Sequence, residues 1–242
     1  MGIFWWAIFP YLMITVFVLG HIYRYQKDQW GWTARSSEFL EKKYLKWGSV
    51  LFHTGILLVF GGHVVGMLIP EAVTERLGIS DKIFHTAAII TGSTAGFITL
   101  AGIVLLLVRR VSVKRVRKTS SFADMLIAVL LFLVVSMGLF NTFGFNLFVK
   151  SSFDYRATIA PWIRGVLVFA PDPGLMNNVP LFFRLHIIFA FAIFGVWPFT
   201  RLVHVWSVPL EYLGRRSYIL YRSVGPVAKP VKEWERASGD VG

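Results

Sequence analysis

Residues 182–206 read FFRLHIIFAFAIFGVWPFTRLVHVW, a stretch that is apolar except for two arginines, two histidines and one threonine. An α-helix rises about 1.5 Å per residue, so this stretch reaches ~37 Å and can cross the ~30 Å hydrocarbon core of a bilayer. His186 and His204 are eighteen residues apart, which is about five turns of an ideal helix. We therefore expect a membrane-spanning helix that carries both histidines on one face, about 27 Å apart.

Four more apolar stretches of similar length precede this one, at residues 3–19, 48–69, 83–108 and 125–148. The chain of 242 residues is 55% hydrophobic and 16% charged, with a mean hydropathy of +0.61, which excludes an ordinary soluble domain. The first stretch has no basic leader and no small-residue cleavage site, so we expect it to remain as a helix. The sequence thus predicts an all-α integral membrane protein with five transmembrane helices.

Basic residues gather in three of the segments that connect or follow these stretches. Six Lys or Arg lie in residues 21–47, six in 109–121 and six after residue 206, against two in 70–82 and three in 149–181. Because loops rich in Lys and Arg stay in the cytoplasm, we expect the N-terminus outside and the C-terminus in the cytoplasm. The net charge of +12 then belongs to membrane loops, which attract anionic lipid, and does not indicate a nucleic-acid partner.

The regions outside the spans give a provisional division of the chain. We expect a membrane domain in residues 1–225 and a cytoplasmic tail in residues 226–242, which docks on lipid headgroups or on a cytoplasmic subunit. Residues 158–169 are apolar and precede a Pro-Asp-Pro-Gly turn, which predicts a short helix in the outer interface. Six tryptophans near the span boundaries are expected in the headgroup layer, namely Trp5, Trp6, Trp30, Trp32, Trp47 and Trp206.

Four of the six histidines lie within two spans, where an ionisable side chain is costly and indicates a functional site. His53 and His63 are ten residues apart on the second span, a rise of about 15 Å. The second and fifth spans run in opposite directions because an odd number of crossings separates them. His53 therefore meets His204 toward the cytoplasm, and His63 meets His186 toward the outside.

Two imidazoles that face each other from neighbouring helices suit a porphyrin iron, which accepts one nitrogen above its plane and one below. A zinc or copper site would instead gather its ligands around one centre. The chain has no cysteine, which excludes disulfides and a thiolate-held Fe–S cluster within it. The sequence therefore predicts two b haems within the bundle, with room for the macrocycles at Gly55, Gly61, Gly62 and Gly66.

Four further residues of the first and fifth spans also have expected positions or roles. Arg184 and Arg201 each lie within three residues of a predicted ligand, where they can neutralise haem propionates or reach toward headgroups. Pro198, between the two histidines of the fifth span, is expected to kink that helix and free a carbonyl. His21, at the inner end of the first span, is expected in the interface without a ligand role.

Longer motifs resemble a known family. The segment FRLH at 183–186 followed by PFTRLVHVWSVPLEYL at 198–213 is similar to the gamma subunit of respiratory nitrate reductase. So are LFH at 51–53 with GH at 62–63, and VLLL at 104–107 running into two arginines. The resemblance covers roughly residues 10–225 and is weakest in the outer loop, 149–180.

The resemblance implies the membrane cytochrome b of a quinol:nitrate oxidoreductase in a bacterial or archaeal plasma membrane. By it, menaquinol or ubiquinol is oxidised near the outer haem, held by His63 and His186. Electrons then reach the inner haem, held by His53 and His204, and pass to an Fe–S beta subunit and a molybdenum-cofactor alpha subunit in the cytoplasm, which reduce nitrate to nitrite. The same plan occurs in the membrane cytochromes of formate dehydrogenases and hydrogenases, which remain alternatives, as does a transporter that uses histidines for protons or metal ions.

In this family a lysine near the outer end of the third span is associated with the quinol site. The local sequence here is Asp81-Lys82-Ile83-Phe84-His85, and its alignment with the family requires a gap. Lys82 is then that lysine in a displaced position, or His85 takes its place as hydrogen-bond partner and proton acceptor. The alternative is that both are ordinary interfacial residues.

Overall fold

The computed structural model describes residues 2–28, 32, 40–149 and 153–207. Five helices in this part of the chain are long and apolar enough to cross a membrane, which confirms the predicted number. They are Phe4–Lys27, Lys43–Leu68, Asp81–Ser112, Phe122–Phe145 and Leu181–Phe199. The predicted cytoplasmic tail and Trp30 lie outside the described residues.

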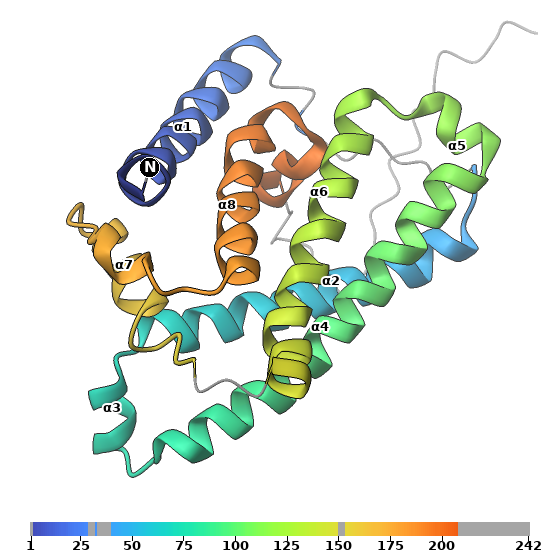
Figure 1. The fold of residues 1–242 in the computed structure, drawn as a ribbon. Coiled ribbons are helices and arrows are strands. Elements are labelled where there is room, and N and C mark those ends of the chain that lie inside the picture. The colour runs from blue at the N-terminus through green and yellow to red at the C-terminus, as the bar shows by residue number, and fades with distance from the viewer. Residues whose placement is uncertain (1, 29–31, 33–39, 150–152, 208–242) are drawn as a thin grey trace, which may run out of the picture. The chain divides into compact units, whose positions relative to one another are not determined.

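Eight α-helices are seen within the described residues (Figure 1). Their bounds are α1 Phe9–Lys27, α2 Lys43–His63, α3 Glu71–Arg76, α4 Asp81–Ser112, α5 Lys114–Thr119, α6 Phe122–Leu139, α7 Ile159–Leu167 and α8 Leu181–Val196. Wider π-helical turns extend three of the spans, at Phe4–Ile8, Val64–Leu68 and Phe140–Val149. Short 3₁₀ turns lie at Pro173–Met176, Trp197–Phe199 and Arg201–Ser207.

Local sequence signals mark where two of the spans begin. Ser80 accepts a hydrogen bond from the Ile83 amide at the start of α4. Ser121 and Asp124 form a reciprocal capping box at the start of α6. These contacts satisfy amide groups that a helix leaves without partners in its first turn. These contacts determine the residue at which each of the two helices begins.

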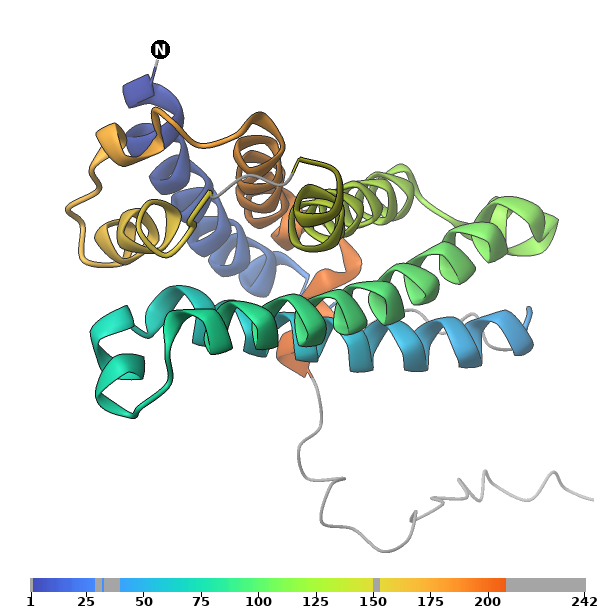
Figure 2. The same cartoon turned by 60° about the horizontal axis from the view of Figure 1, so that its bottom comes forward.

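Helices α2 and α4 lie side by side in both ribbon views (Figures 1 and 2). Glycines permit this close approach. A Cβ atom on Gly55 would lie 2.6 Å from the Thr99 backbone nitrogen, and one on Gly102 would overlap the backbone of Phe52. Small residues of this kind allow transmembrane helices to pack backbone against backbone. Gly55 is therefore a helix-packing residue, and our expectation that it makes room for a macrocycle was wrong.

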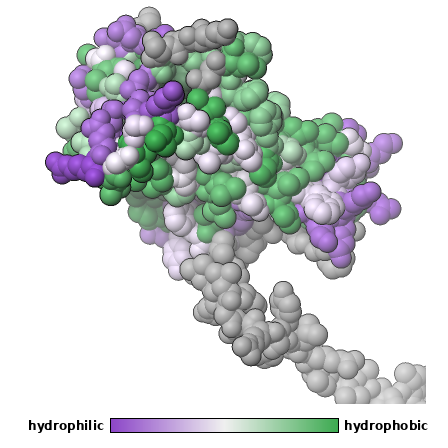
Figure 3. All heavy atoms as spheres, turned by 90° about the horizontal axis from the view of Figure 1, so that it is seen from below, coloured by the Kyte–Doolittle hydropathy of each residue, from purple (hydrophilic) through white to green (hydrophobic). Residues whose placement is uncertain are grey.

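The remaining spans continue the bundle from α4. Helix α6 packs against α4 and α8, and α8 packs against α1 on its other side. At the end of the bundle near the start of the chain, Trp162 of α7 joins a buried cluster with Trp6, Met176 and Phe191. Over the face shown in Figure 3, hydrophobic residues occupy the middle of the molecule and hydrophilic residues gather at its two ends. This distribution suits a protein that spans a bilayer.

Trp6, which the sequence suggested for the headgroup layer, is buried against other parts of the protein. Its side chain is 6% exposed and meets the ring of Trp162 edge to face, at 5.7 Å between centroids. The Trp162 indole also donates to the Trp6 carbonyl, at 2.8 Å. The short helix predicted in residues 158–169 is thus present as α7, and it covers the outer end of α1 through this tryptophan pair.

The fifth span departs from a continuous helix. Helix α8 ends at Val196, a 3₁₀ turn follows, and Thr200 adopts an extended backbone before the second 3₁₀ segment, Arg201–Ser207. The cause is Pro198, which lacks an amide donor and whose ring clashes with a preceding carbonyl in a helix. The kink predicted at Pro198 is confirmed, and it interrupts the ideal five-turn spacing between His186 and His204.

Candidate functional site

The four intramembrane histidines lie in two pairs. The rings of His53 and His204 are 6.0 Å apart between centroids, and their planes are inclined at 75°. The rings of His63 and His186 are 6.1 Å apart, with planes inclined at 20°. Each pair joins one residue of α2 to one residue of the fifth span. The break at Pro198 therefore does not prevent His204 from meeting its partner.

All four imidazoles use the same ring nitrogen for a hydrogen bond to a backbone carbonyl. The Nδ1 atoms of His53, His63, His186 and His204 lie 2.8, 2.7, 3.0 and 2.6 Å from carbonyl oxygens. A carbonyl oxygen can only accept, so Nδ1 carries the proton in each of these bonds. The neutral ring then has its lone pair on Nε2, the form in which histidine binds metals, with the other nitrogen held by a carbonyl.

His21 has the same contact on one nitrogen but a different one on the other. Its Nδ1 lies 2.7 Å from the Phe17 carbonyl, and its Nε2 accepts a hydrogen bond from the Trp206 indole at 3.1 Å. The lone pair that a metal would need is thus already used. This contact gives a physical reason for the expectation that His21 has no ligand role.

Helix α6 shapes the position of His186. The carbonyl that holds His186 Nδ1 belongs to Val134 on α6, and a Cβ on Gly138 would lie 2.9 Å from His186 Cε1. The imidazole thus occupies space that any side chain at position 138 would fill. Nothing in the sequence marked Val134 or Gly138, because both lie in an apolar span that carries no predicted ligand.

A group of charged residues is linked to His204 through Arg201. Its Nδ1 is held by the carbonyl of Arg201, whose side chain donates from Nε to Asp124 at 2.6 Å. Arg110 of α4 lies 3.5 Å from the other carboxylate oxygen of Asp124. The buried carboxylate of Asp124 therefore links α6 to Arg110 of α4 and to Arg201 of the segment after the break. The position of Asp124 at the start of a span did not reveal this role.

The two arginines expected near haem propionates differ in the structure. Arg201 is paired with Asp124 through Nε. Arg184 has a buried Nε atom that no group within the described residues accepts from. A buried guanidinium donor without an acceptor is costly, and a carboxylate of a bound ligand would satisfy it. Arg184 is therefore the better placed of the two to bind such a group.

The glycines of α2 near the outer pair differ in their surroundings. A Cβ on Gly61 or Gly62 would meet no atom within 4 Å, whereas one on Gly66 would lie 3.4 Å from the Tyr155 hydroxyl. Open space thus adjoins α2 directly before His63.

His85 lies in a cluster of titratable side chains at the outer end of α4. Its Nε2 is 3.4 Å from Asp81 Oδ1 and 3.7 Å from Asp154 Oδ1. Its ring also lies 5.7 Å from that of Tyr155, the residue that covers Gly66 three positions beyond His63. Burial raises the pKa of the Tyr155 hydroxyl, so this hydroxyl stays protonated at neutral pH. Lys82, by contrast, is exposed.

Arg156 holds this outer cluster together. It donates to Asp81 at 3.4 Å and to Thr74 at 2.9 Å, and its guanidinium lies 3.9 Å from the ring centre of Phe84. The sequence alone did not indicate Arg156 or Asp154, because their loop is joined to α4 only in the folded chain.

Comparison with known proteins decides the family. The chain matches the sequence model of the family described as nitrate reductase gamma subunit over residues 2–224. The chain belongs to this family. The chain is 53% identical over 217 residues to the nitrate reductase gamma chain of Bacillus subtilis (strain 168), with 90% of this chain and 96% of the relative covered.

Two further relatives extend the comparison. The respiratory nitrate reductase 2 gamma chain of Escherichia coli (strain K12) is 37% identical over 222 residues, with 91% of this chain and 96% of the relative covered. The nitrate reductase-like protein NarX of Mycobacterium tuberculosis (strain ATCC 25618 / H37Rv) is 39% identical over 223 residues, which are 92% of this chain and 34% of that protein. A gamma subunit is by its name one chain of a larger nitrate reductase, an oxidoreductase.

Proposed function

We propose that this gamma subunit is the membrane cytochrome b of a quinol:nitrate oxidoreductase and holds two b haems. His53 and His204 are the axial ligands of the inner haem, and His63 and His186 are those of the outer haem. The observation that carries this proposal is the pairing of four imidazoles at about equal separation, each with Nδ1 on a carbonyl. Family membership favours it over the cytochromes of formate dehydrogenase or hydrogenase.

The ring separations fit a metal ion between the two imidazoles of each pair. Metal–imidazole bonds of about 2 Å put two opposed nitrogens about 4 Å apart, and each ring centre lies roughly 1 Å behind its nitrogen. The expected separation of centroids is then about 6 Å, as found for both pairs at 6.0 and 6.1 Å. Within the described residues no three His, Cys, Asp or Glu side chains gather as a metal-binding group, which disfavours a zinc-binding transporter.

Haem held in this way supplies one-electron transfer from quinol near the outer face to an Fe–S beta subunit and a molybdenum-cofactor alpha subunit in the cytoplasm, where nitrate becomes nitrite. The chain itself fixes the tautomer of each ligand through the carbonyl bonds and provides the Arg184 guanidinium for a propionate. With the N-terminus outside and the C-terminus inside a plasma membrane, protons of quinol leave on the outer side. Each charge moved across the bilayer is worth about 2.3 kcal/mol per 100 mV.

His85 is the proton acceptor for quinol in this proposal, in preference to Lys82. His85 lies on α4, is partly buried and faces Tyr155 of the loop that follows α6. Lys82 is exposed on the first turn of α4. Two carboxylates lie within 4 Å of His85 Nε2, so when the other ring nitrogen, Nδ1, takes a proton from quinol, the proton on Nε2 has an onward acceptor at Asp81 or Asp154. Both carboxylates are partly exposed, which gives the proton a route to water.

The test of the proposed function is a reduced-minus-oxidised absorption spectrum, with haem quantified as the pyridine haemochrome, on the purified complex. We expect two b haems for each gamma subunit and reduction of both by a soluble quinol analogue. Well-folded protein without haem would overturn the proposal and return the histidine pairs to a proton-transporting role.

The quinol site is tested by comparing His85→Phe with Lys82→Gln in the complex. We expect His85→Phe to slow quinol oxidation by about 10²-fold or more, the usual contribution of a general base, with both haems retained. Lys82→Gln should change the rate little. The reverse result would assign the site to Lys82, and unchanged kinetics in both variants would remove this end of α4 from the quinol site.

A further inference from the structure

Helix α1 carries no predicted ligand, yet its inner end contacts the break in the fifth span. Arg24 of α1 donates from one guanidinium nitrogen, Nη1, to the carbonyls of Pro198 and Thr200, at 2.7 and 2.8 Å. These are carbonyls of the irregular segment between α8 and the 3₁₀ turn that carries His204. A charged donor shared by two carbonyls makes strong hydrogen bonds, and few groups inside a membrane can replace it.

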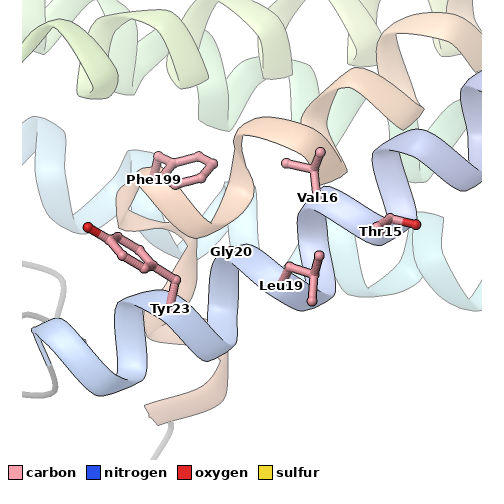
Figure 4. A pocket seen from close by; sticks show the side chains of 6 residues that line it. All are labelled: Thr15, Val16, Leu19, Gly20, Tyr23 and Phe199. Atoms are coloured by element: carbon pink, nitrogen blue, oxygen red, sulfur yellow. The ribbon is translucent and has the colours of Figure 1, made fainter.

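The backbones of α1 and the break also lie unusually close together. A Cβ on Gly20 would lie 2.8 Å from the ring of Pro198, so only glycine fits without displacement. Figure 4 shows the pocket beside this approach, which is lined by Val16, Gly20 and Tyr23 of α1, among others, and by Phe199 of the turn after α8. The approach brings Arg24, one turn beyond Gly20, within reach of both carbonyls.

A second contact of α1 lies after His204, where the indole of Trp206 donates to His21 at 3.1 Å. Helix α1 therefore contacts the chain on both sides of His204, at Pro198 and Thr200 before it and at Trp206 after it. A 3₁₀ turn of seven residues has poor hydrogen-bond geometry and does not hold its shape alone. Because the carbonyl of Arg201 in turn holds His204 Nδ1, a shift of this segment would move the imidazole directly.

From this geometry we propose that Arg24 is a positioning residue for the inner haem ligand: it fixes the broken segment of the fifth span so that His204 faces His53. The inference rests on the proposed function, since it concerns the ligand of a haem. It goes beyond that function by giving α1 a specific task at one of the two haems. Within the described residues the outer pair shows no contact of this kind, because His186 precedes the break and is held by α6.

The test compares Arg24→Gln with Lys27→Gln in the complete complex. Lys27 carries the same charge at the same end of α1 and is exposed, so Lys27→Gln controls for loss of charge and for topology. The readouts are the redox potential of each haem and the rate at which each haem is lost to a haem-scavenging globin. Outer-shell contacts of metal ligands typically change affinity by about 10- to 100-fold, so we expect about tenfold faster loss of the inner haem in Arg24→Gln.

The outer haem of the same molecule is the internal reference for folding. We expect its potential and its rate of loss to stay unchanged in Arg24→Gln, and Arg24→Lys to restore the inner haem in part, since an ammonium also donates to carbonyls. Equal loss of both haems, or no change in either, would overturn the inference while leaving the proposed function intact. Absence of haem from the unmodified complex would instead overturn the proposed function.

Discussion

The outer and inner histidine pairs have nearly the same ring separation but are held by different kinds of contact. In the outer pair, His186 lies inside a regular helix, and its position is set by the Val134 carbonyl and by the space at Gly138. In the inner pair, His204 lies beyond a helix break whose carbonyls accept from Arg24, in a short segment that begins with Arg201, which donates to Asp124. The position of the outer pair thus depends on how α6 packs beside His186. The position of the inner pair depends on the hydrogen bonds that Arg24 and Arg201 make with their charged side chains.

This difference follows from where each pair lies along the fifth span. A transmembrane helix satisfies its own backbone, so a ligand within it needs only a neighbour that leaves room. A segment after a proline has carbonyls that the helix no longer uses, and another group has to bind them. Arg24 and the Asp124 group occur at the end of the bundle where the sequence places cytoplasmic loops.

The largest effects are expected from removing one ligand of each pair. His186→Ala should remove the outer haem and keep the inner one, and His204→Ala should do the reverse, because each iron then has one protein ligand instead of two. The pyridine haemochrome should fall from two haems to one for each gamma subunit. A redox titration of the remaining haem identifies which of the two was lost.

The two variants also separate the pairings. If His204→Ala and His63→Ala removed the same haem, the antiparallel pairing would be contradicted. Loss of both haems from either single variant would show that the two sites do not form independently.

A smaller effect is expected from filling the space beside His186. Gly138→Ala would place a methyl group 2.9 Å from the imidazole Cε1, so the ring or α6 has to move. We expect a shifted potential and about tenfold faster loss of the outer haem, with the inner haem unchanged. Val129→Leu, which adds one methylene to an exposed position of the same helix, is the matched control. An equal response of both haems would show that α6 does not act on the outer pair alone.

The sequence sufficed for the number of spans and for which histidines meet, because both follow from local patterns. Apolar length determines a span, and the opposite directions of α2 and α8 determine which histidines share a depth. The pairing did not depend on an intact fifth helix. His204 meets His53 although the ideal five-turn spacing from His186 is interrupted at Pro198.

The contacts that orient the ligands could not be read from the sequence, because they join residues far apart in the chain. Arg24 is 174 residues from Pro198, and Val134 is 52 residues from His186. In sequence, Arg24 is one basic residue among several in a cytoplasmic loop, and Gly138 is one small residue in an apolar run. Only the packing of α1 and α6 against the fifth span gives these residues their roles.

The smallest effect is expected from an ion pair that ties the inner end of α4 to the start of α2. Glu41 accepts from Arg109 Nε at 2.9 Å and from the Tyr44 and Leu45 amides at the first turn of α2. Burial acts to raise the pKa of the Glu41 carboxyl, but the bonds from Tyr44 and Arg109 outweigh it and hold this pKa below 4.5. Glu41→Gln should therefore lower the free energy of unfolding at neutral pH by about 1–3 kcal/mol.

The sign of the pH dependence follows from this lowered pKa. A carboxyl whose pKa is lower in the folded chain stabilises it fully above its ordinary value of 4.5 and loses that contribution as the pH falls through the folded value. Thermal unfolding of the complex should separate Glu41→Gln from the unmodified protein at pH 7, and the difference should close in acid. Glu75→Gln, at an exposed position of α3, is the control. A difference that persisted unchanged in acid would mean that the pair contributes through packing and not through charge, and would weaken the contrast between the inner and outer ends of the bundle.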